Sequence, residues 1–308
     1  MLTGPVSRSN DVVLAHRALR DGYGDLAGFE AAIQKDRQDL LEAQTGFAFV
    51  SGGQADWLDL LRPLAKTWNG FSHRETQGED AVGPVTRYLR TNTFYRRPHV
   101  NAKISCGGHE LAQFLPPVQN GVAWVLGPYS FTAMVDDGFY GDAEGMACDY
   151  AAAVAESVPA LRAQGYRCVL WLEPVVGYRQ SKNEFTAPKW LASAYPKIQN
   201  VTAGVHFPLA DGAALLSDVS DATVDFVGLD GFFTDPKNVR TEKDVLWGAV
   251  DGARFFVESA AQIRKSLEFF SRNAEFSGRY LVGPNDRLFD VPFHVGLEKT
   301  RALYGGCR

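Results

Sequence analysis

The sequence predicts an α/β protein, a (β/α)8 TIM barrel with a long insertion after the second strand. Short β-rich runs alternate with helical patterns along the 308 residues, as in a barrel of roughly 250 residues or more. Several of the runs are almost continuously apolar, which is typical of parallel strands that are covered on both faces. No linker divides the chain, so we expect one domain over residues 1–308. An open doubly wound sheet is the alternative, but no GxGxxG follows the first predicted strand.

Eight segments have the composition of strands. They are Met1 to Pro5, Phe47 to Ser51, Val122 to Leu126, Cys168 to Leu172, Val201 to Val205, Val224 to Leu229, Val245 to Val250 and Tyr280 to Val282.

Helical patterns lie between these segments. Leu26 to Gln44 has apolar residues at helical spacing, and Asp142 to Gln164 is rich in alanine and ends before Gly165. The other predicted helices are Leu191 to Ile198, Gly212 to Val219, Ser259 to Asn273 and Val295 to Tyr304.

The insertion, Lys66 to Leu115, is rich in glycine, proline, arginine and aromatic residues. Loops of this length are usually functional or disordered, and the aromatic residues argue against disorder. We expect a partly ordered cover on the substrate side. The sequence TNTFY is flanked by arginines that either hold an anionic substrate or form a solvated face, namely Arg87, Arg90, Arg96 and Arg97.

Composition excludes some partners. The net charge is −5 and no basic tract is present, so we expect no nucleic-acid partner. No apolar run has the length of a membrane span, and the first residues lack the apolar core of a signal peptide. We therefore expect a cytoplasmic protein without a membrane partner.

Polar residues follow most of the predicted strands, where the active sites of barrel enzymes lie. Four carboxylates and one histidine stand at these ends: Glu173, Asp230, Asp251, Asp286 and His206. One imidazole with carboxylates suits iron(II), manganese or zinc with open coordination positions. The alternative is structural: His206 is satisfied by hydrogen bonds, and the carboxylates cap helices or pair with Arg254 and Arg287.

Glu173 directly follows an apolar strand. It is either an anchor for a substrate amino group, a general acid or base, or the acceptor of structural hydrogen bonds. Glu173 and Asp230 also suit a glycosidase pair, with Trp57, Trp124 and Trp171 as sugar platforms. Trp124 and Trp171 lie in apolar runs, however, so core packing explains them better.

Seven motifs, in this order, resemble the cobalamin-independent methionine synthase family over essentially the whole chain. They are GDLAGFEAAIQKDRQDLLEAQ, SGGQADWLDL, TNTFYRRP, LGPYSF, LEP, GAVDGARFFVES and YLVGPNDRL. The family transfers a methyl group to the sulfur of homocysteine, which a zinc ion holds as a thiolate.

The resemblance also implies positions for the zinc ligands. The family's His-x-Cys pair falls on His206 and Pro208, its glutamate on Asp230 and its last cysteine on Asp286. Both thiolates are therefore replaced, and the expected metal ligands are His206, Asp230 and Asp286. The family's Gly-Glu, an amino-acid contact, reads Gly53-Gln54, and its Asp-Glu-Pro reads Leu-Glu-Pro.

The resemblance implies a methionine-synthase-like S-methyltransferase that acts on homocysteine or a related thiol, with an altered metal site. A folate or a methyl-corrinoid would donate the methyl group. Two alternatives stay open: a repurposed iron or manganese enzyme, and a non-catalytic accessory subunit that binds a second methionine-synthase-like or corrinoid protein. We predict Glu173 and Asp251 as catalytic residues. The predicted substrate-binding residues are Gln54, Asn92, Tyr129, Ser130 and Glu173.

Overall fold

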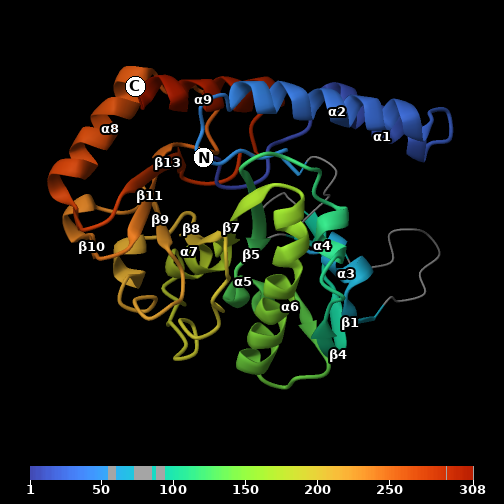
Figure 1. Ribbon diagram of the computed structural model, residues 1–308, viewed down its shortest axis with the longest axis horizontal. Coiled ribbons are helices and arrows are strands. Elements are labelled where there is room, and N and C mark those ends of the chain that lie inside the picture. The colour runs from blue at the N-terminus through green and yellow to red at the C-terminus, as the bar shows by residue number, and fades with distance from the viewer. Residues whose placement is uncertain (55–59, 73–84, 88–93, 289, 308) are drawn as a thin grey trace.

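The centre of the protein is a curled, six-stranded parallel sheet with strand order β13-β11-β9-β8-β7-β5 (Figure 1). The computed structural model describes residues 1–54, 60–72, 85–87, 94–288 and 290–307. The strands of this sheet are β5 (Gly121–Leu126), β7 (Tyr166–Leu172), β8 (Thr202–Phe207), β9 (Phe226–Asp230), β11 (Asp244–Val250) and β13 (Tyr280–Pro284). All neighbours pair in parallel, so their carboxyl ends meet at one edge. Six of the eight predicted strands are thus confirmed.

The first two predicted strands are wrong, because Val6, just after the first segment, and Val50, within the second, each make only an isolated bridge. Val6 pairs with Leu288, next to β13, and Val50 pairs with Gly121 at the start of β5. Pro5 has no N–H to donate to a ladder, and the chain turns at Gly53 and Gln54, which have φ angles of 79° and 49°. The described residues therefore show a half-barrel, not a complete (β/α)8 barrel.

The two edges of the sheet approach each other through the N-terminal segment. The amino group of Met1 donates to the carbonyl of Val282 on β13 at 2.7 Å. The indole of Trp124 on β5 donates to the carbonyl of Leu2 at 3.2 Å. This contact across the sheet shows how strongly the sheet curls.

The long helices begin at the polar caps that the sequence offers. Asp25, Asp142 and Ser259 each accept a backbone N–H of the helix that follows. The predicted long helices are confirmed as α2 (Leu26–Ala43), α6 (Ala143–Ala163), α8 (Ala260–Asn273) and α9 (Phe293–Gly306). Figure 1 shows α2 and α9 side by side along one end of the sheet.

A helical hairpin precedes the sheet. It consists of α1 (Asn10–Arg20), which the sequence reasoning missed, and α2. Val12 and Ile33 form a small apolar cluster of their own between the two helices. The carboxylate of Asp36 accepts the N–H of Ser9 at 2.8 Å and ties the start of α1 to α2.

Two of the predicted helices are corrected. Residues 191–198 form turns, because residues that precede a proline avoid the helical region and Tyr195 precedes Pro196. The prediction at 212–219 shrinks to the short 3-10 helix η1 (Gly212–Leu215). Conversely, α5 (Pro128–Met134) and α7 (Pro174–Gln180) were missed. Each begins with a proline directly after a strand, which is a usable signal for a helix start.

The insertion lies between Val50 and β5, as predicted. Strand β1 (Asn69–Ser72) pairs with β4 (His99–Ser105), and β4 pairs with β6 (Asp136–Asp137). Tyr95 and Arg97 donate to the carbonyls of Met134 and Val135 at 3.0 and 2.9 Å. These residues end α5, so the insertion is attached beside the carboxyl edge of the sheet; its role as a cover stays a prediction. The remaining elements are α3 (Arg62–Thr67), β2 (Val85–Arg87), β3 (Phe94–Arg96), α4 (Glu110–Gln113), η2 (Pro236–Asn238), β10 (Arg240–Thr241) and β12 (Glu275–Phe276).

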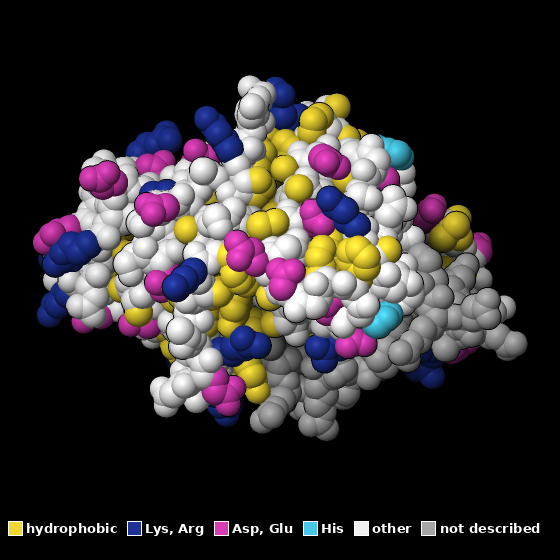
Figure 2. Space-filling model, turned by 90° about the horizontal axis from the view of Figure 1, so that it is seen from below, with side chains coloured by type: hydrophobic (Ala, Val, Ile, Leu, Met, Phe, Trp, Pro, Cys, Tyr) yellow, Lys and Arg dark blue, Asp and Glu magenta, His cyan; other side chains and the backbone are white. Residues whose placement is uncertain are grey.

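Large apolar side chains of the central sheet are packed in the core. Trp124, Trp171 and Cys168 are fully buried, so the predicted core packing is confirmed for the two tryptophans, which are not exposed sugar platforms. Figure 2 shows acidic and basic side chains interspersed beside a band of hydrophobic side chains, with no field of one sign on that face. Within the described part of the chain, no helix has the length and apolar character needed to cross a membrane.

Candidate functional site

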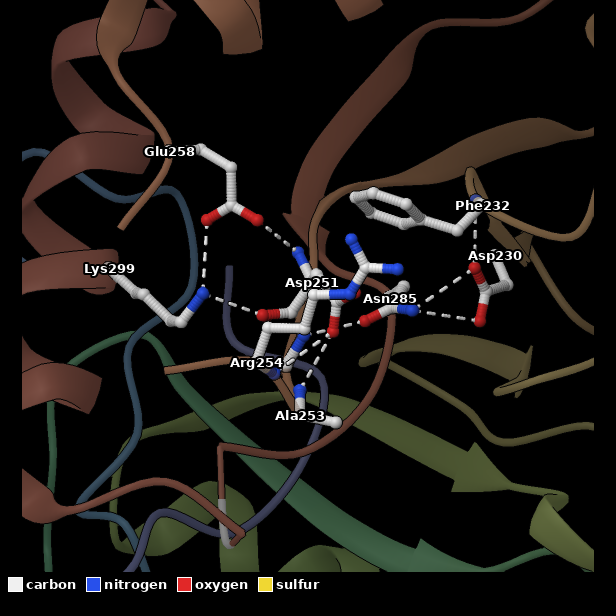
Figure 3. A network of polar contacts seen from close by, with 9 residues as sticks. Asp230, Phe232, Asp251, Ala253, Arg254, Glu258, Asn285 and Lys299 are labelled. Carbon is white, nitrogen blue, oxygen red and sulfur yellow. Dashed lines mark hydrogen bonds and ion pairs between the residues drawn. The ribbon is translucent and has the colours of Figure 1, made fainter. Parts of the chain in front are cut away.

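Asn285, the first residue after β13, joins the ends of three strands (Figure 3). Its side-chain amide donates to both carboxylate oxygens of Asp230, at 3.2 and 3.1 Å. Its side-chain oxygen accepts the N–H of Gly252 at 2.8 Å. Its carbonyl oxygen lies 2.6 Å from Nε2 of His206. A carbonyl only accepts, so His206 carries its proton on Nε2.

Asp230 is fully buried at the end of β9. Besides Asn285, its Oδ1 accepts the N–H of Phe232 at 2.9 Å and its Oδ2 accepts the N–H of Leu209 at 2.8 Å. Burial raises the pKa of Asp230 to about 7, although these N–H donors oppose the shift. Each oxygen already accepts two hydrogen bonds, so Asp230 holds the loops after β8, β9 and β13 together.

The predicted metal ligands do not fit a metal in this arrangement. His206 uses Nε2 as a donor, and its Nδ1 lies against Gly228 of the neighbouring strand without a hydrogen-bond partner. Burial lowers the pKa of His206 to about 4, which keeps the ring neutral. Asp230 has no free acceptor position, and Oδ1 of Asp286 accepts the N–H of Arg287 at 2.7 Å. No group of three or more His, Cys, Asp or Glu among the described residues is placed to hold a metal.

The loop after β11 folds around Asp251. Its Oδ1 accepts the N–H groups of Ala253 and Arg254 at 3.0 and 3.2 Å. Its Oδ2 pairs with Nε of Arg254 at 3.1 Å, as in the structural alternative to a metal site. Asp251 therefore shapes its own loop and fixes the base of the Arg254 side chain.

A buried lysine supports this loop from behind. Lys299 on α9 is fully buried and donates to the carbonyl of Asp251 at 2.7 Å and to Glu258 at 3.0 Å. The other oxygen of Glu258 accepts the N–H of Asp251 at 2.9 Å. Sequence reasoning missed Lys299, Glu258 and Asn285. One signal was available for Lys299: it stands four residues from Val295 and from Leu303, on the buried face of α9.

Glu173 forms a second polar centre at the same edge. It is fully buried; Oε1 accepts the N–H of Tyr129 at 3.1 Å and the hydroxyl of Tyr195 at 2.8 Å. Oε2 accepts the N–H of Ser130 at 2.7 Å. Burial raises the pKa of Glu173 to about 7. The structure thus brings the predicted Glu173, Tyr129 and Ser130 together, with Tyr195 as a partner that had not been predicted.

The remaining predicted residues lie elsewhere. Gln54 is buried beside β5, where its Oε1 accepts the N–H of Trp124 at 3.2 Å. Asn92 and Trp57 lie outside the described residues. The side chains of Arg87, Arg90 and Arg96 are likewise not described.

Asn285 and its partners Asp230, His206 and Gly252 are called the Asn285 centre below. Large apolar side chains are exposed around it. Their exposed fractions range from 42% to 68%, and they lie on the loops after β8, β9 and β11: Leu209, Phe232, Phe233, Phe255 and Phe256. These five side chains form an apolar border around the polar centre.

No protein-family model and no curated protein sequence matches this chain. Solved structures do match it, at low sequence identity. A B12-independent methionine synthase from Shewanella sp. W3-18-1, in complex with selenomethionine, has a TM-score of 0.72 and 15% identity, and the match covers 99% of this chain and 95% of that one. A putative vitamin-B12-independent methionine synthase from Listeria monocytogenes has a TM-score of 0.69 and 14% identity, with 99% and 94% covered.

A methyltransferase from Methanosarcina mazei is also similar, with a TM-score of 0.57 and 12% identity over 99% of this chain and 92% of that chain. At these identities the likeness concerns the fold. The chain shares its architecture with methionine-synthase-like proteins and methyltransferases over nearly its whole length.

Proposed function

We propose that this protein is a methyltransferase of the methionine-synthase-like type, which acts on the sulfur of homocysteine or a related small thiol. The observation that carries the proposal is the fold likeness over 99% of the chain to a methionine synthase in complex with selenomethionine. The Asn285 centre lies at the carboxyl edge of the sheet, where barrel enzymes bind their substrates. We also propose that the half-barrel closes through the bridges at Val6 and Val50 into the full barrel that the sequence predicts.

The overall reaction balances without further reactants. A thiol R–SH and a methyl group on a donor nitrogen give R–S–CH3 and N–H: the sulfur–carbon bond forms, the carbon–nitrogen bond breaks, and the nitrogen keeps the electron pair and receives the thiol proton. The donor would be a folate, or a methyl-corrinoid in which cobalt is the leaving atom. The nucleophile is the thiolate, and a free thiol has a pKa of about 8.5. No step is routed through a metal, because Nε2 of His206 and both carboxylate oxygens of Asp230 are already engaged in hydrogen bonds.

Two carboxylates keep free acceptor positions for a substrate. Among the described residues, Oδ2 of Asp286 has no hydrogen-bond partner, and Oδ2 of Asp251 contacts only Arg254. We place a substrate ammonium group near these two oxygens, since a carboxylate is the natural partner of an amine cation. Asn285 and Asp230 would act by holding the loops on which these groups stand.

One observation favours a second candidate, the non-catalytic accessory subunit. Glu173 and Asp230 are fully buried, and structural hydrogen bonds occupy their oxygens. A chain that only binds a small molecule or a partner protein would tolerate this sealing better than an enzyme that needs the two groups for proton transfer.

The test is methyl transfer by the full chain. L-homocysteine is incubated with 5-methyltetrahydrofolate or with methylcobalamin, and methionine is measured by mass spectrometry. We expect enzyme-dependent methionine with one donor, at a rate that rises with pH toward the thiol pKa of about 8.5. Asn285→Ala should lower kcat/KM at least about tenfold by releasing three loops. Glu268→Gln, a substitution on the exposed face of α8, is the matched control.

The other outcomes separate the alternatives. Turnover that appears only after iron(II) or manganese is added would favour the repurposed metal enzyme. Absence of turnover with both donors, together with retained binding of L-methionine, would favour the accessory role. Absence of both turnover and methionine binding would remove the proposal.

A further inference from the structure

We infer that Arg254 forms an anion subsite at the mouth of the Asn285 centre, which takes the carboxylate of a small molecule that also carries an apolar group. The inference deepens the proposed function and rests on it for the sulfur chemistry, while the anion subsite itself depends only on the geometry of the loop after β11. Neither the fold likeness nor the sequence motifs assign a role to this arginine.

The guanidinium is fixed at its base and free at its end. Nε of Arg254 pairs with Oδ2 of Asp251 at 3.1 Å, and the backbone N–H of Arg254 is held by Oδ1 of the same carboxylate. Among the described residues, the two Nη groups have no hydrogen-bond partner, and the side chain is 66% exposed. A guanidinium with two free Nη groups offers the paired donors that a carboxylate accepts.

The loop that carries Arg254 is anchored at Asp251. The buried ion pair between Lys299 and Glu258 holds both the carbonyl and the N–H of Asp251. The centroid of the Phe256 ring lies 5.3 Å from Nζ of Lys299 and 5.9 Å from the guanidinium carbon of Arg254. An arginine held in place before the ligand arrives loses less conformational entropy on binding.

The surroundings define the class of ligand. Asp251 offsets the single positive charge of Arg254, and the two free Nη groups offer one pair of donors, which matches one carboxylate and not a chain of phosphates. The exposed ring of Phe255 supplies apolar surface on the same loop, and that of Phe232 does so on the loop after β9. Figure 3 shows the guanidinium pointing toward the side of Asn285 where Phe232 lies. A small amphiphilic monocarboxylate, such as an amino acid with an apolar side chain, satisfies both features.

The experiment compares ligands that differ in one group, by isothermal titration calorimetry on the full chain. The probes are L-methionine, L-methioninol, which lacks the carboxylate, and L-norleucine, which has a methylene in place of the sulfur. We expect the wild type to bind L-methionine about tenfold more tightly than L-methioninol, as for one charge-assisted contact. Arg254→Gln should lose that factor for L-methionine and leave L-methioninol unchanged, and Arg254→Lys should fall between.

Arg272→Gln is the matched control, because Arg272 is also a mostly exposed arginine in an ion pair, on α8. It should bind L-methionine like the wild type. Equal affinity of the wild type for L-methionine and L-methioninol, or unchanged L-methionine binding by Arg254→Gln, would overturn the inference. L-norleucine binding as well as L-methionine, with the same loss in Arg254→Gln, supports the subsite and counts against the sulfur specificity. A wild type that binds none of the three overturns the subsite, whereas the proposed function is decided by the turnover measurement.

Discussion

Two polar centres lie at the carboxyl edge of the same sheet, and they differ in what surrounds them. The Glu173 centre is sealed: its carboxylate is fully buried under the start of α5 and the hydroxyl of Tyr195. The Asn285 centre is buried below but opens outward through Arg254, whose side chain is 66% exposed. A strongly raised pKa occurs in both, at Glu173 and at Asp230. The raised pKa therefore does not distinguish the two centres, whereas their access to solvent does.

The largest effect on stability should come from the ion pair between Lys299 and Glu258, which supports the Asn285 centre. Glu258→Gln leaves the buried ammonium group of Lys299 without its carboxylate, and breaking such a pair costs about 3–5 kcal/mol. Urea unfolding measures the loss. Replacing both partners, as Glu258→Leu with Lys299→Met, should recover part of it, because two apolar groups need no partner. An effect no greater than that of Glu268→Gln, whose pair with Arg272 is exposed, would show that the loop is not anchored here.

The second largest loss of stability should come from the hydrogen bonds between Asn285 and Asp230. Asn285→Asp removes the amide that donates to Asp230 and places a second carboxylate beside it, so we expect a loss of about 2–3 kcal/mol near pH 8. The loss should shrink near pH 5, since one shared proton relieves the repulsion. Chemical unfolding at both pH values measures this change. A loss that does not depend on pH would mean that the two carboxylates do not meet.

The third largest loss of stability is expected for Glu173→Gln, in the buried Glu173 centre. The new amide group must face an N–H or hydroxyl donor, which costs about 1–3 kcal/mol near neutral pH. Tyr195→Phe, which removes a single donor, should cost about 1 kcal/mol. Methionine binding should stay at the wild-type level in both variants; a specific loss of binding without a loss of stability would make Glu173 part of the functional site.

The raised pKa of the Glu173 carboxyl group predicts that the unfolding free energy depends on pH. The pKa of Glu173 is raised from 4.5 to about 7, so between these values the folded state binds more protons than the unfolded state. Its contribution to the unfolding free energy therefore falls as the pH rises through this window and is constant above it. Glu173→Gln should show a shallower decline than the wild type across pH 4.5–7 in thermal unfolding. Parallel curves would contradict the raised pKa.

The smallest effect on stability should come from Arg254→Gln. Its ion pair with Asp251 is mostly exposed on the arginine side, and such pairs contribute about 0–1 kcal/mol. The expected result is a melting temperature within about 3 °C of the wild type, together with the tenfold loss of methionine binding described above. A large stability loss would make Arg254 a structural residue and weaken its assignment as a ligand contact.

The sequence predicts the central strands and long helices well because their signals are local. Continuous apolar runs mark β5, β7 and β11, and Asp142 and Ser259 mark helix starts. The first two strands failed because Pro5 and Gly53 interrupt runs that are already short.

The candidate site was only partly predictable. Asp230, Asp251 and Glu173 stand at strand ends and could be selected for that reason. Their partners could not, because Lys299 and Asn285 reach them from distant parts of the chain. Whether a carboxylate binds a ligand or holds two loops depends on those long-range contacts, and a single sequence does not record them.

The small apolar cluster between α1 and α2 has a consequence for the dynamics of the chain. Because Val12 and Ile33 pack separately from the main core, the outer part of this hairpin can open while the parallel sheet stays intact. Amide hydrogens of α1 should then exchange with deuterium sooner than those of β7 and β8, and limited proteolysis should cut first near Gly22. The hairpin would be a segment whose outer part fluctuates without opening the carboxyl edge of the parallel sheet.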